Sequence, residues 1–176
     1  MANWFNSRLK KNFKDYLDKR KNMKKRILLY LLIILCKFSF AQEESPYVKK
    51  SFVIIQSTKT YSAAKATANR AAKGLKLKLD LRNLKPHKTA GLTDAKNECE
   101  DNGWEYPCYV SRGRYDEGEY VSIEWSDAFK NFTKGYYIVI VYSGNKKEAN
   151  ATLKKVKKVF ADAYVKDDEV YMGCMH

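Results

Sequence analysis

The chain has 176 residues, which suits one domain with an appendage rather than several domains. Apolar residues make up 45% of it and aromatic residues 14%, enough for a packed core, so a wholly disordered chain is excluded. The net charge of +14 is unevenly spread. Residues 1–41 hold 11 basic and 2 acidic side chains (+9), and residues 42–176 hold 23 and 18 (+5). The basicity therefore belongs mainly to the first 41 residues, and we expect no nucleic-acid partner for the rest.

Residues 23–41 have the parts of a secretory signal peptide. Met-Lys-Lys-Arg precedes an apolar run at 27–36, and Ser39 and Ala41 are small residues at the −3 and −1 positions for cleavage before Gln42. The apolar run is about half of the ~20 residues that a membrane-spanning helix needs, which favours a signal peptide over a permanent anchor. The sequence thus predicts export to the periplasm, the cell envelope or the medium, with membrane attachment only through an uncleaved signal segment.

Residues 1–22 allow two interpretations. Apolar residues such as Trp4, Leu9 and Phe13 are spaced as on one face of a basic amphipathic helix. Because a complete signal peptide starts at Met23, we favour the second interpretation, in which translation begins there and residues 1–22 are not translated. The remaining chain divides into a linker at 42–50 and one folded domain at 51–176.

The order β-α-β appears twice in that domain. In the first unit, a β-branched run at 51–57 predicts a strand, Ala-rich residues 61–74 a helix, and the alternating leucines of 75–81 a half-buried strand. In the second unit, we expect a strand at 136–142, a helix at 145–159 capped by Asn145, and a strand at 161–166. A shift of 85 residues superposes the two units without a gap. Packed side by side they bury a common core, which predicts an α+β domain.

Residues 83–134 interrupt the two units as an insertion. Its first part carries Cys99 and Cys108 on either side of a turn-forming segment, and an exported chain favours a disulfide between them over free thiols. Its second part predicts a hairpin, with strands at 109–115 and 119–126 around Asp116-Glu117-Gly118. Val121, Ile123 and Trp125 alternate along the second strand and are expected to extend the core.

Four segments carry a family resemblance: Phe52–Gln56, Tyr137-Ile-Val-Ile-Val, Asn145-Lys-Lys-Glu-Ala-Asn, and Phe160-Ala-Asp-Ala-Tyr-Val. They resemble the two strand openings, a helix start and the closing strand of the SPOR domain, the sporulation-related repeat of bacterial envelope proteins. The resemblance implies a ferredoxin-like β-α-β-β-α-β fold, with an antiparallel sheet and two helices on one face. It also implies binding of peptidoglycan glycan strands stripped of stem peptides. The insertion at 83–134 is foreign to the compact family form.

A glycan site needs aromatic faces for sugar rings and hydrogen-bonding groups at their rims. The alternation of 75–81 places its polar residues on the face opposite the leucines, where they line an open sheet face or are simply solvated. The candidate glycan-binding residues are Gln56, Lys76, Lys78, Arg82, Tyr142 and Tyr164.

A secondary candidate site lies in the insertion, at Arg112, Arg114 and Tyr115. Arginine suits planar anions, so these residues predict an anion or glycan contact. The alternative, which we slightly favour, is pairing with Asp116, Glu117 and Glu119. The insertion also supports a second hypothesis for the whole protein, a protein–protein interaction module or secreted inhibitor that acts through residues 83–134.

The sequence does not predict an enzyme, a metal site or a cofactor. His87 lies in a polar loop and His176 is the last residue, and no nucleophile or phosphate-loop motif is present. Glu119 and Glu124 are the one pair to consider for glycosidase chemistry. Being five residues apart on a strand, they are expected to point to opposite faces.

Overall fold

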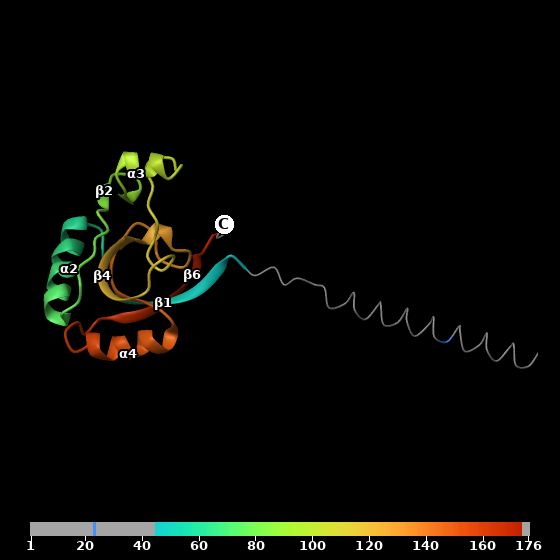
Figure 1. Cartoon of the computed structure of the whole chain (residues 1–176). Helices are drawn as coiled ribbons and strands as arrows, with labels where there is room; N and C mark the ends of the chain where they lie inside the picture. The colour runs from blue at the N-terminus through green and yellow to red at the C-terminus, as the bar shows by residue number, and fades with distance from the viewer. Residues whose placement is uncertain (1–22, 24–44, 174–176) are drawn as a thin grey trace, which may run out of the picture. The chain divides into compact units, whose positions relative to one another are not determined.

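The computed structural model describes Met23 and residues 45–173 (Figure 1). The predictions for residues 1–22 and for the signal peptide beyond Met23 lie outside this part of the chain. Residues 42–50 were expected to be a linker, but the first strand, β1 (Tyr47–Thr58), begins within them. The segment Ser45–His176 is a compact unit in its own right.

The fold is α+β, as the sequence predicts, around one four-stranded antiparallel sheet. Its strands are β1, β4 (Gly118–Trp125), β5 (Tyr137–Gly144) and β6 (Tyr164–Tyr171), in the order β4-β5-β1-β6. Helix α2 (Tyr61–Leu75) follows β1, and helix α4 (Lys146–Val156) follows β5. The elements of this sheet and its two helices therefore follow one another as β-α-β-β-α-β.

The second strand of this order is β4, and not residues 75–81. These residues form only an isolated parallel bridge, Leu79 with Val121, through two backbone hydrogen bonds at the edge of β4. Left-handed backbone at Lys76, and again at Arg82 and Asn83, limits the extended stretch to a few residues. The alternation still describes the side chains correctly, because the four leucines pack against the core.

The predicted hairpin is also half right. Its second arm is β4, but residues 109–115 form no strand. In this stretch the Arg112 side chain points into the sheet, where it donates a hydrogen bond to Ser143. Helix α4 ends at Val156, three residues early, and β6 begins at Tyr164 rather than at residue 161. Asn145 caps α4 as predicted, since its side chain accepts a hydrogen bond from the Glu148 N–H at 2.9 Å.

Both helices lie on one face of the sheet, where the larger core forms (Figure 1). The Ala-rich face of α2 lets this helix approach the strands closely. Val121, Ile123 and Trp125 join this core, as expected from their alternation. The main apolar contributors from sheet and helices are Val53, Ile55, Ala64, Ala68, Ala71, Val139, Val141, Ala149 and Val156.

The opposite face of the sheet, called here the far face, is covered by the insertion. Residues 126–136, which begin with the short 3-10 helix η1 (Ser126–Ala128), run across it. Phe129 and Phe132 from this segment pack on Phe52, with ring centroids 5.2 and 6.0 Å away. A second core therefore lies between sheet and insertion, and the far face is largely closed.

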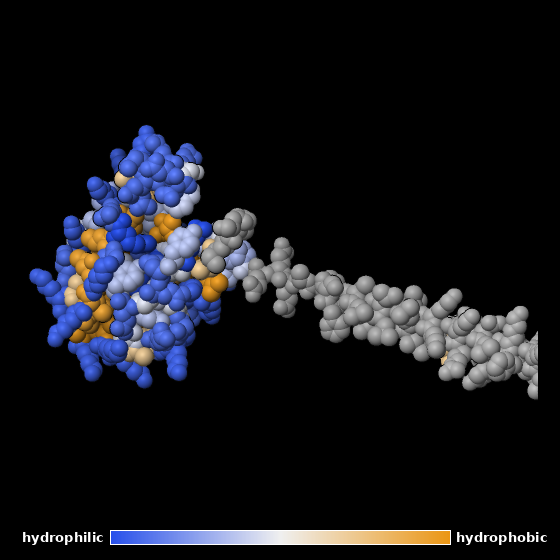
Figure 2. All heavy atoms as spheres, in the orientation of Figure 1, coloured by the Kyte–Doolittle hydropathy of each residue, from blue (hydrophilic) through white to orange (hydrophobic). Residues whose placement is uncertain are grey.

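The remainder of the insertion forms a projection, defined as residues 83–108. It contains the small sheet of β2 (Lys85–His87) and β3 (Gly91–Thr93), and helix α3 (Lys96–Asp101). The disulfide between Cys99 and Cys108 is present, with the Cα atoms 5.9 Å apart, as predicted. Figure 2 shows that the tip of this projection has an almost wholly hydrophilic surface.

Phe129→Ala is expected to lower the free energy of unfolding by about 3–5 kcal/mol, because it opens a cavity under residues 126–136. Urea denaturation measures this difference. The matched control is Tyr115→Ala, an aromatic residue that is 68% exposed, for which we expect a change within about 0.5 kcal/mol. Equal effects of the two substitutions would show that the far face is not closed by a packed core.

Asp167 connects β6 to β1 and α4, since its carboxylate accepts hydrogen bonds from Ser51 Oγ at 2.7 Å and Lys146 Nζ at 2.8 Å. The bonds from Lys146 and Ser51 hold the pKa of Asp167 below its ordinary value of 3.8. This stabilisation is therefore complete above that value and is lost as the pH falls through the lower pKa of the folded state. Asp167→Asn should cost about 0.5–1 kcal/mol near neutral pH. In unfolding measurements over a series of acid pH values, the difference in stability between Asp167→Asn and the unsubstituted chain should vanish at low pH. A difference in stability that does not change with pH would contradict this assignment.

Candidate functional site

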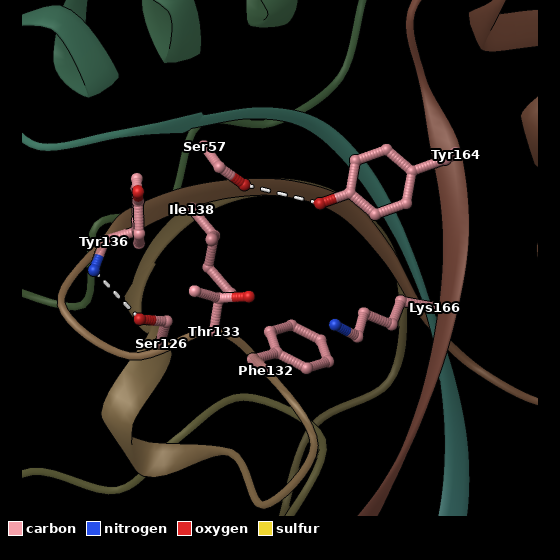
Figure 3. A pocket seen from close by; sticks show the side chains of 8 residues that line it. All are labelled: Ser57, Ser126, Phe132, Thr133, Tyr136, Ile138, Tyr164 and Lys166. Atoms are coloured by element: carbon pink, nitrogen blue, oxygen red, sulfur yellow. Dashed lines mark hydrogen bonds between the residues drawn. The ribbon is translucent and has the colours of Figure 1, made fainter.

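A pocket of about 240 Å³ remains open on the far face, beside residues 126–136. We call it the Tyr164 pocket. Figure 3 shows the side chains that surround it, with Tyr164 and Ser57 on one side and Phe132 and Lys166 on another. The residues that line it are Ser57, Ser126, Phe132, Thr133, Tyr136, Ile138, Tyr164 and Lys166.

Strand register explains why these side chains meet. Residues directly opposite each other in paired strands point to the same face of a sheet. Tyr164 lies opposite Ile54, and Lys166 opposite Phe52, and both partners belong to the far-face core. Ser57 lies opposite Ile138 in the same way. Two strands, β1 and β6, therefore present one hydroxyl, one phenol and one ammonium group to this pocket.

The pocket combines aromatic surface with hydrogen-bonding groups. Tyr164 is 42% exposed, and its hydroxyl lies 3.3 Å from Ser57 Oγ. The Lys166 ammonium lies 4.9 Å from the centre of the Phe132 ring. No carboxylate among residues 45–173 forms an ion pair with Lys166, so its charge is available to a ligand.

The other predicted glycan-binding residues do not gather at this pocket. Lys76 and Lys78 lie beyond the β4 edge of the sheet, where Lys78 pairs with Asp80 at 2.7 Å. Gln56 faces the helices, opposite Val139, and Tyr142 is buried against the start of α4. Burial and a hydrogen bond to Glu148 raise the pKa of Tyr142 to about 12. Of the six residues, only Tyr164 lies at the pocket.

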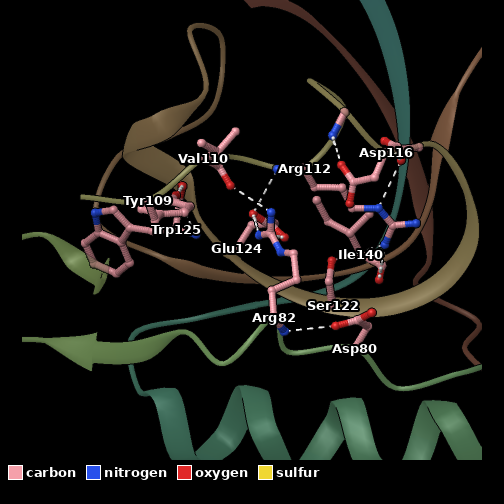
Figure 4. Close-up of polar contacts among 12 residues, drawn as sticks. Asp80, Arg82, Tyr109, Val110, Arg112, Asp116, Ser122, Glu124, Trp125 and Ile140 are labelled. Atoms are coloured by element: carbon pink, nitrogen blue, oxygen red, sulfur yellow. Dashed lines mark hydrogen bonds and ion pairs between the residues drawn. The ribbon is translucent and has the colours of Figure 1, made fainter. Parts of the chain in front are cut away.

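Arg82, the sixth residue, takes part in a buried charge network with Glu124 (Figure 4). Its guanidinium donates to both oxygens of the Glu124 carboxylate at 2.6 Å, and also to the Val110 carbonyl at 2.7 Å. Glu124 is fully buried on the far face. Burial raises the pKa of Glu124, while the positive charges of Arg82 and Arg112 oppose that rise.

Arg112 completes the network and is itself fully buried. Its backbone N–H donates to Glu124 (Figure 4). Its guanidinium donates to Ser143 Oγ and to three strand carbonyl groups. Burial lowers the pKa of Arg112 to about 10. The predicted ligand contact at Arg112 is thus wrong for a surface ligand, and so is the predicted pairing with the nearby acids, because backbone oxygens and Ser143 satisfy this side chain.

The other residues of the secondary site are placed differently. Tyr115 is the most exposed of the large hydrophobic side chains in the described chain, and Arg114 is half-buried beside it, with the guanidinium carbon 4.9 Å from the Tyr115 ring centre. Only these two of the three residues are open to a ligand.

Glu119 and Glu124 do not face each other. Glu119 accepts a hydrogen bond from Thr152 Oγ1 of α4 at 2.7 Å, whereas Glu124 lies in the network on the far face.

Within Met23 and residues 45–173, no group of three or more His, Cys, Asp and Glu side chains is placed to hold a metal ion. Nor does this part of the chain contain a helix with the length and apolar content needed to cross a bilayer.

Sequence reasoning missed Ser57, Lys166 and the residues at 132–136. Lys166 had a usable signal, because it lies two residues after Tyr164 on one strand and must share its face. The residues at 132–136 had none, since nothing local shows where a connecting segment crosses a sheet.

Comparison of the chain with protein-family models, with curated proteins and with solved structures gives no match. The resemblance to SPOR domains therefore stays a prediction from the residues quoted above.

Glu124→Gln is expected to lower the free energy of unfolding by about 3–5 kcal/mol, because it leaves the half-buried Arg82 guanidinium without its carboxylate in a network that is otherwise buried. The control is Glu100→Gln, which removes the exposed ion pair with Lys96 on α3 and should cost less than about 1 kcal/mol. Denaturant titration of both variants tests the difference. If Glu124→Gln unfolds like the control, the network contributes nothing to folding.

Proposed function

We propose that this chain is an exported, non-catalytic binding protein of the bacterial cell envelope, and that it binds peptidoglycan glycan strands at the Tyr164 pocket. The observation that carries the proposal is the composition of this pocket, where an exposed phenol ring stands beside hydroxyl groups and an ammonium group that no carboxylate of residues 45–173 pairs. Aromatic faces pack on the C–H groups of sugar rings, while hydroxyl and ammonium groups bind the sugar oxygens.

The position of the pocket supports the same proposal. It lies on the sheet face opposite the helices, at the end where residues 126–136 leave the strands uncovered. Its floor contains Ile138 and Phe132, both held by the far-face core, so the recess is supported by packed side chains. Export rests on the signal-peptide pattern at 23–41, and the choice of peptidoglycan rests on the resemblance to SPOR domains.

Residues 42–176 should be retained by intact peptidoglycan sacculi in a pull-down, and more strongly after an amidase has removed stem peptides. Tyr164→Ala is expected to weaken retention about three- to tenfold, through loss of ring stacking. Lys166→Ala should weaken it to a similar extent.

The control substitutions are Tyr106→Ala and Lys85→Ala, which change exposed residues of the same types in the projection. Absence of retention on both intact and stripped material would refute glycan binding. Retention that is unaffected by Tyr164→Ala and Lys166→Ala would place the glycan elsewhere on the surface.

A second candidate function is protein binding through the projection, favoured by its exposed aromatic residues and its charge. Trp104 and Tyr106 are exposed within the loop that the disulfide closes. Residues 94–105 contain five acidic side chains and one lysine, a net charge of −4 in a predicted mature chain that is positive overall. Such a surface suits a basic protein partner. Trp104→Ala would then abolish partner capture while sacculus retention stays unchanged.

A further inference from the structure

Arg114 has no hydrogen-bonding partner among residues 45–173. Its Nε atom is buried and unpaired, and none of the ion pairs of the described chain includes its guanidinium. The Nε atom of Arg82 is also buried and unpaired, but the terminal nitrogens of Arg82 bind Glu124 and the Val110 carbonyl. The Arg112 guanidinium is bound to Ser143 and to strand carbonyl groups, so Arg114 alone of these three has no bonded guanidinium nitrogen within residues 45–173. Buried donors in folded proteins almost always have an acceptor, and within residues 45–173 no acceptor bonds any nitrogen of the Arg114 guanidinium, so the whole group is available to an acceptor from outside this part of the chain.

The Arg114 side chain lies in a cleft of about 520 Å³, called here the Arg114 cleft. Tyr47, Tyr109 and Tyr171 form part of its walls. Tyr47 and Tyr171 are both exposed, with ring centroids 5.2 Å apart, and the Arg114 guanidinium carbon lies 5.3 Å from the Tyr171 ring centre. The guanidinium group is therefore placed beside aromatic rings that a ligand can also reach.

The two lysines of the cleft already have partners. Lys130 Nζ pairs with Glu169 at 2.6 Å, and Lys134 Nζ donates to the carbonyl groups of Asp127 and Phe129. Asp127 also lines the cleft, but it forms no ion pair with Arg114. Within residues 45–173, Arg114 is thus the cation of this cleft whose guanidinium has no bound partner.

We propose that the Arg114 cleft binds a carboxylate carried on a sugar ring. The planar guanidinium fork matches the two oxygens of a carboxylate, and the tyrosine rings provide a surface for the ring that bears it. Ser111 and the hydroxyl groups of the exposed Tyr47 and Tyr171 supply further hydrogen-bonding capacity at the wall, whereas the Tyr109 hydroxyl is already bonded to the Trp125 backbone. This site is separate from the Tyr164 pocket and does not depend on the function proposed above, since different residues line it.

The test is an NMR titration of ¹⁵N-labelled residues 42–176 with D-glucuronate, followed at the Arg114 Nε–H signal. We expect saturable shifts with a Kd on the order of millimolar, as for a single charged contact with a small sugar. Binding should weaken as salt is added, because the interaction is between charges. D-glucose and the methyl ester of D-glucuronate lack the negative charge and should bind at least tenfold more weakly.

Three variants define the role of the side chain. Arg114→Gln should abolish saturable binding, and Arg114→Lys should weaken it, because an ammonium group cannot form the bidentate contact. Arg70→Gln is the matched control, since Arg70 is exposed on α2 and packs over the Phe160 ring. That variant should bind D-glucuronate as the unsubstituted chain does.

Equal affinity for D-glucuronate and its methyl ester would overturn the proposal, and so would undiminished binding by Arg114→Gln. N-acetyltyrosine serves as the peptide-type carboxylate in a parallel titration. If it binds at Arg114 more tightly than D-glucuronate, the cleft recognises a peptide carboxylate and the assignment to a sugar is wrong. If Tyr164→Ala abolishes retention on sacculi and Arg114→Gln does not, the Tyr164 pocket and the Arg114 cleft bind their ligands independently.

Discussion

The buried carboxylate of Glu124 is the constraint on which the rest of this architecture depends. An ionised carboxylate without water is strongly destabilising unless cations and hydrogen-bond donors surround it. Arg82 reaches it from the segment after α2, and the Arg112 N–H reaches it from the insertion. This one residue of strand β4 thereby holds residues 76–84 and residues 109–116, two segments separated in sequence, against the strand.

This network explains how the insertion becomes part of the domain. Because Arg112 donates to carbonyl groups of the strand region, residues 109–116 are held against the far face near β4 and β5. Residues 126–136 cover the centre of the same face through Phe129 and Phe132. The far face is therefore not an open platform, and what remains of it is one pocket on the β6 side and one cleft beside Arg114. Ligand binding at either place would use residues from both the strands and the insertion.

Charge is also divided between parts of the domain. The acidic side chains of residues 94–105 are concentrated in the projection, which is closed by the disulfide and has a hydrophilic surface (Figure 2). Lys166 and Arg114, which form no ion pair with any residue of 45–173, belong instead to the recesses of the far face. Among the described residues, no acidic side chain of residues 94–105 forms an ion pair with Lys166 or Arg114.

The sequence by itself determined the elements whose signal is local. The Ala-rich spacing of α2, the β-branched runs of β1 and β5, the Asn145 cap and the spacing of Cys99 and Cys108 all depend on neighbours in the chain. Only the tertiary structure decided which strand stands second in the β-α-β-β-α-β order. The leucine alternation of 75–81 reports which side chains are buried, whereas strand pairing depends on the backbone partner, and β4 pairs with β5 instead. Of the six predicted glycan-binding residues, only Tyr164 lies at the pocket. Which residues share a site depends on the register between strands and on the path of residues 126–136, and a local sequence pattern contains neither.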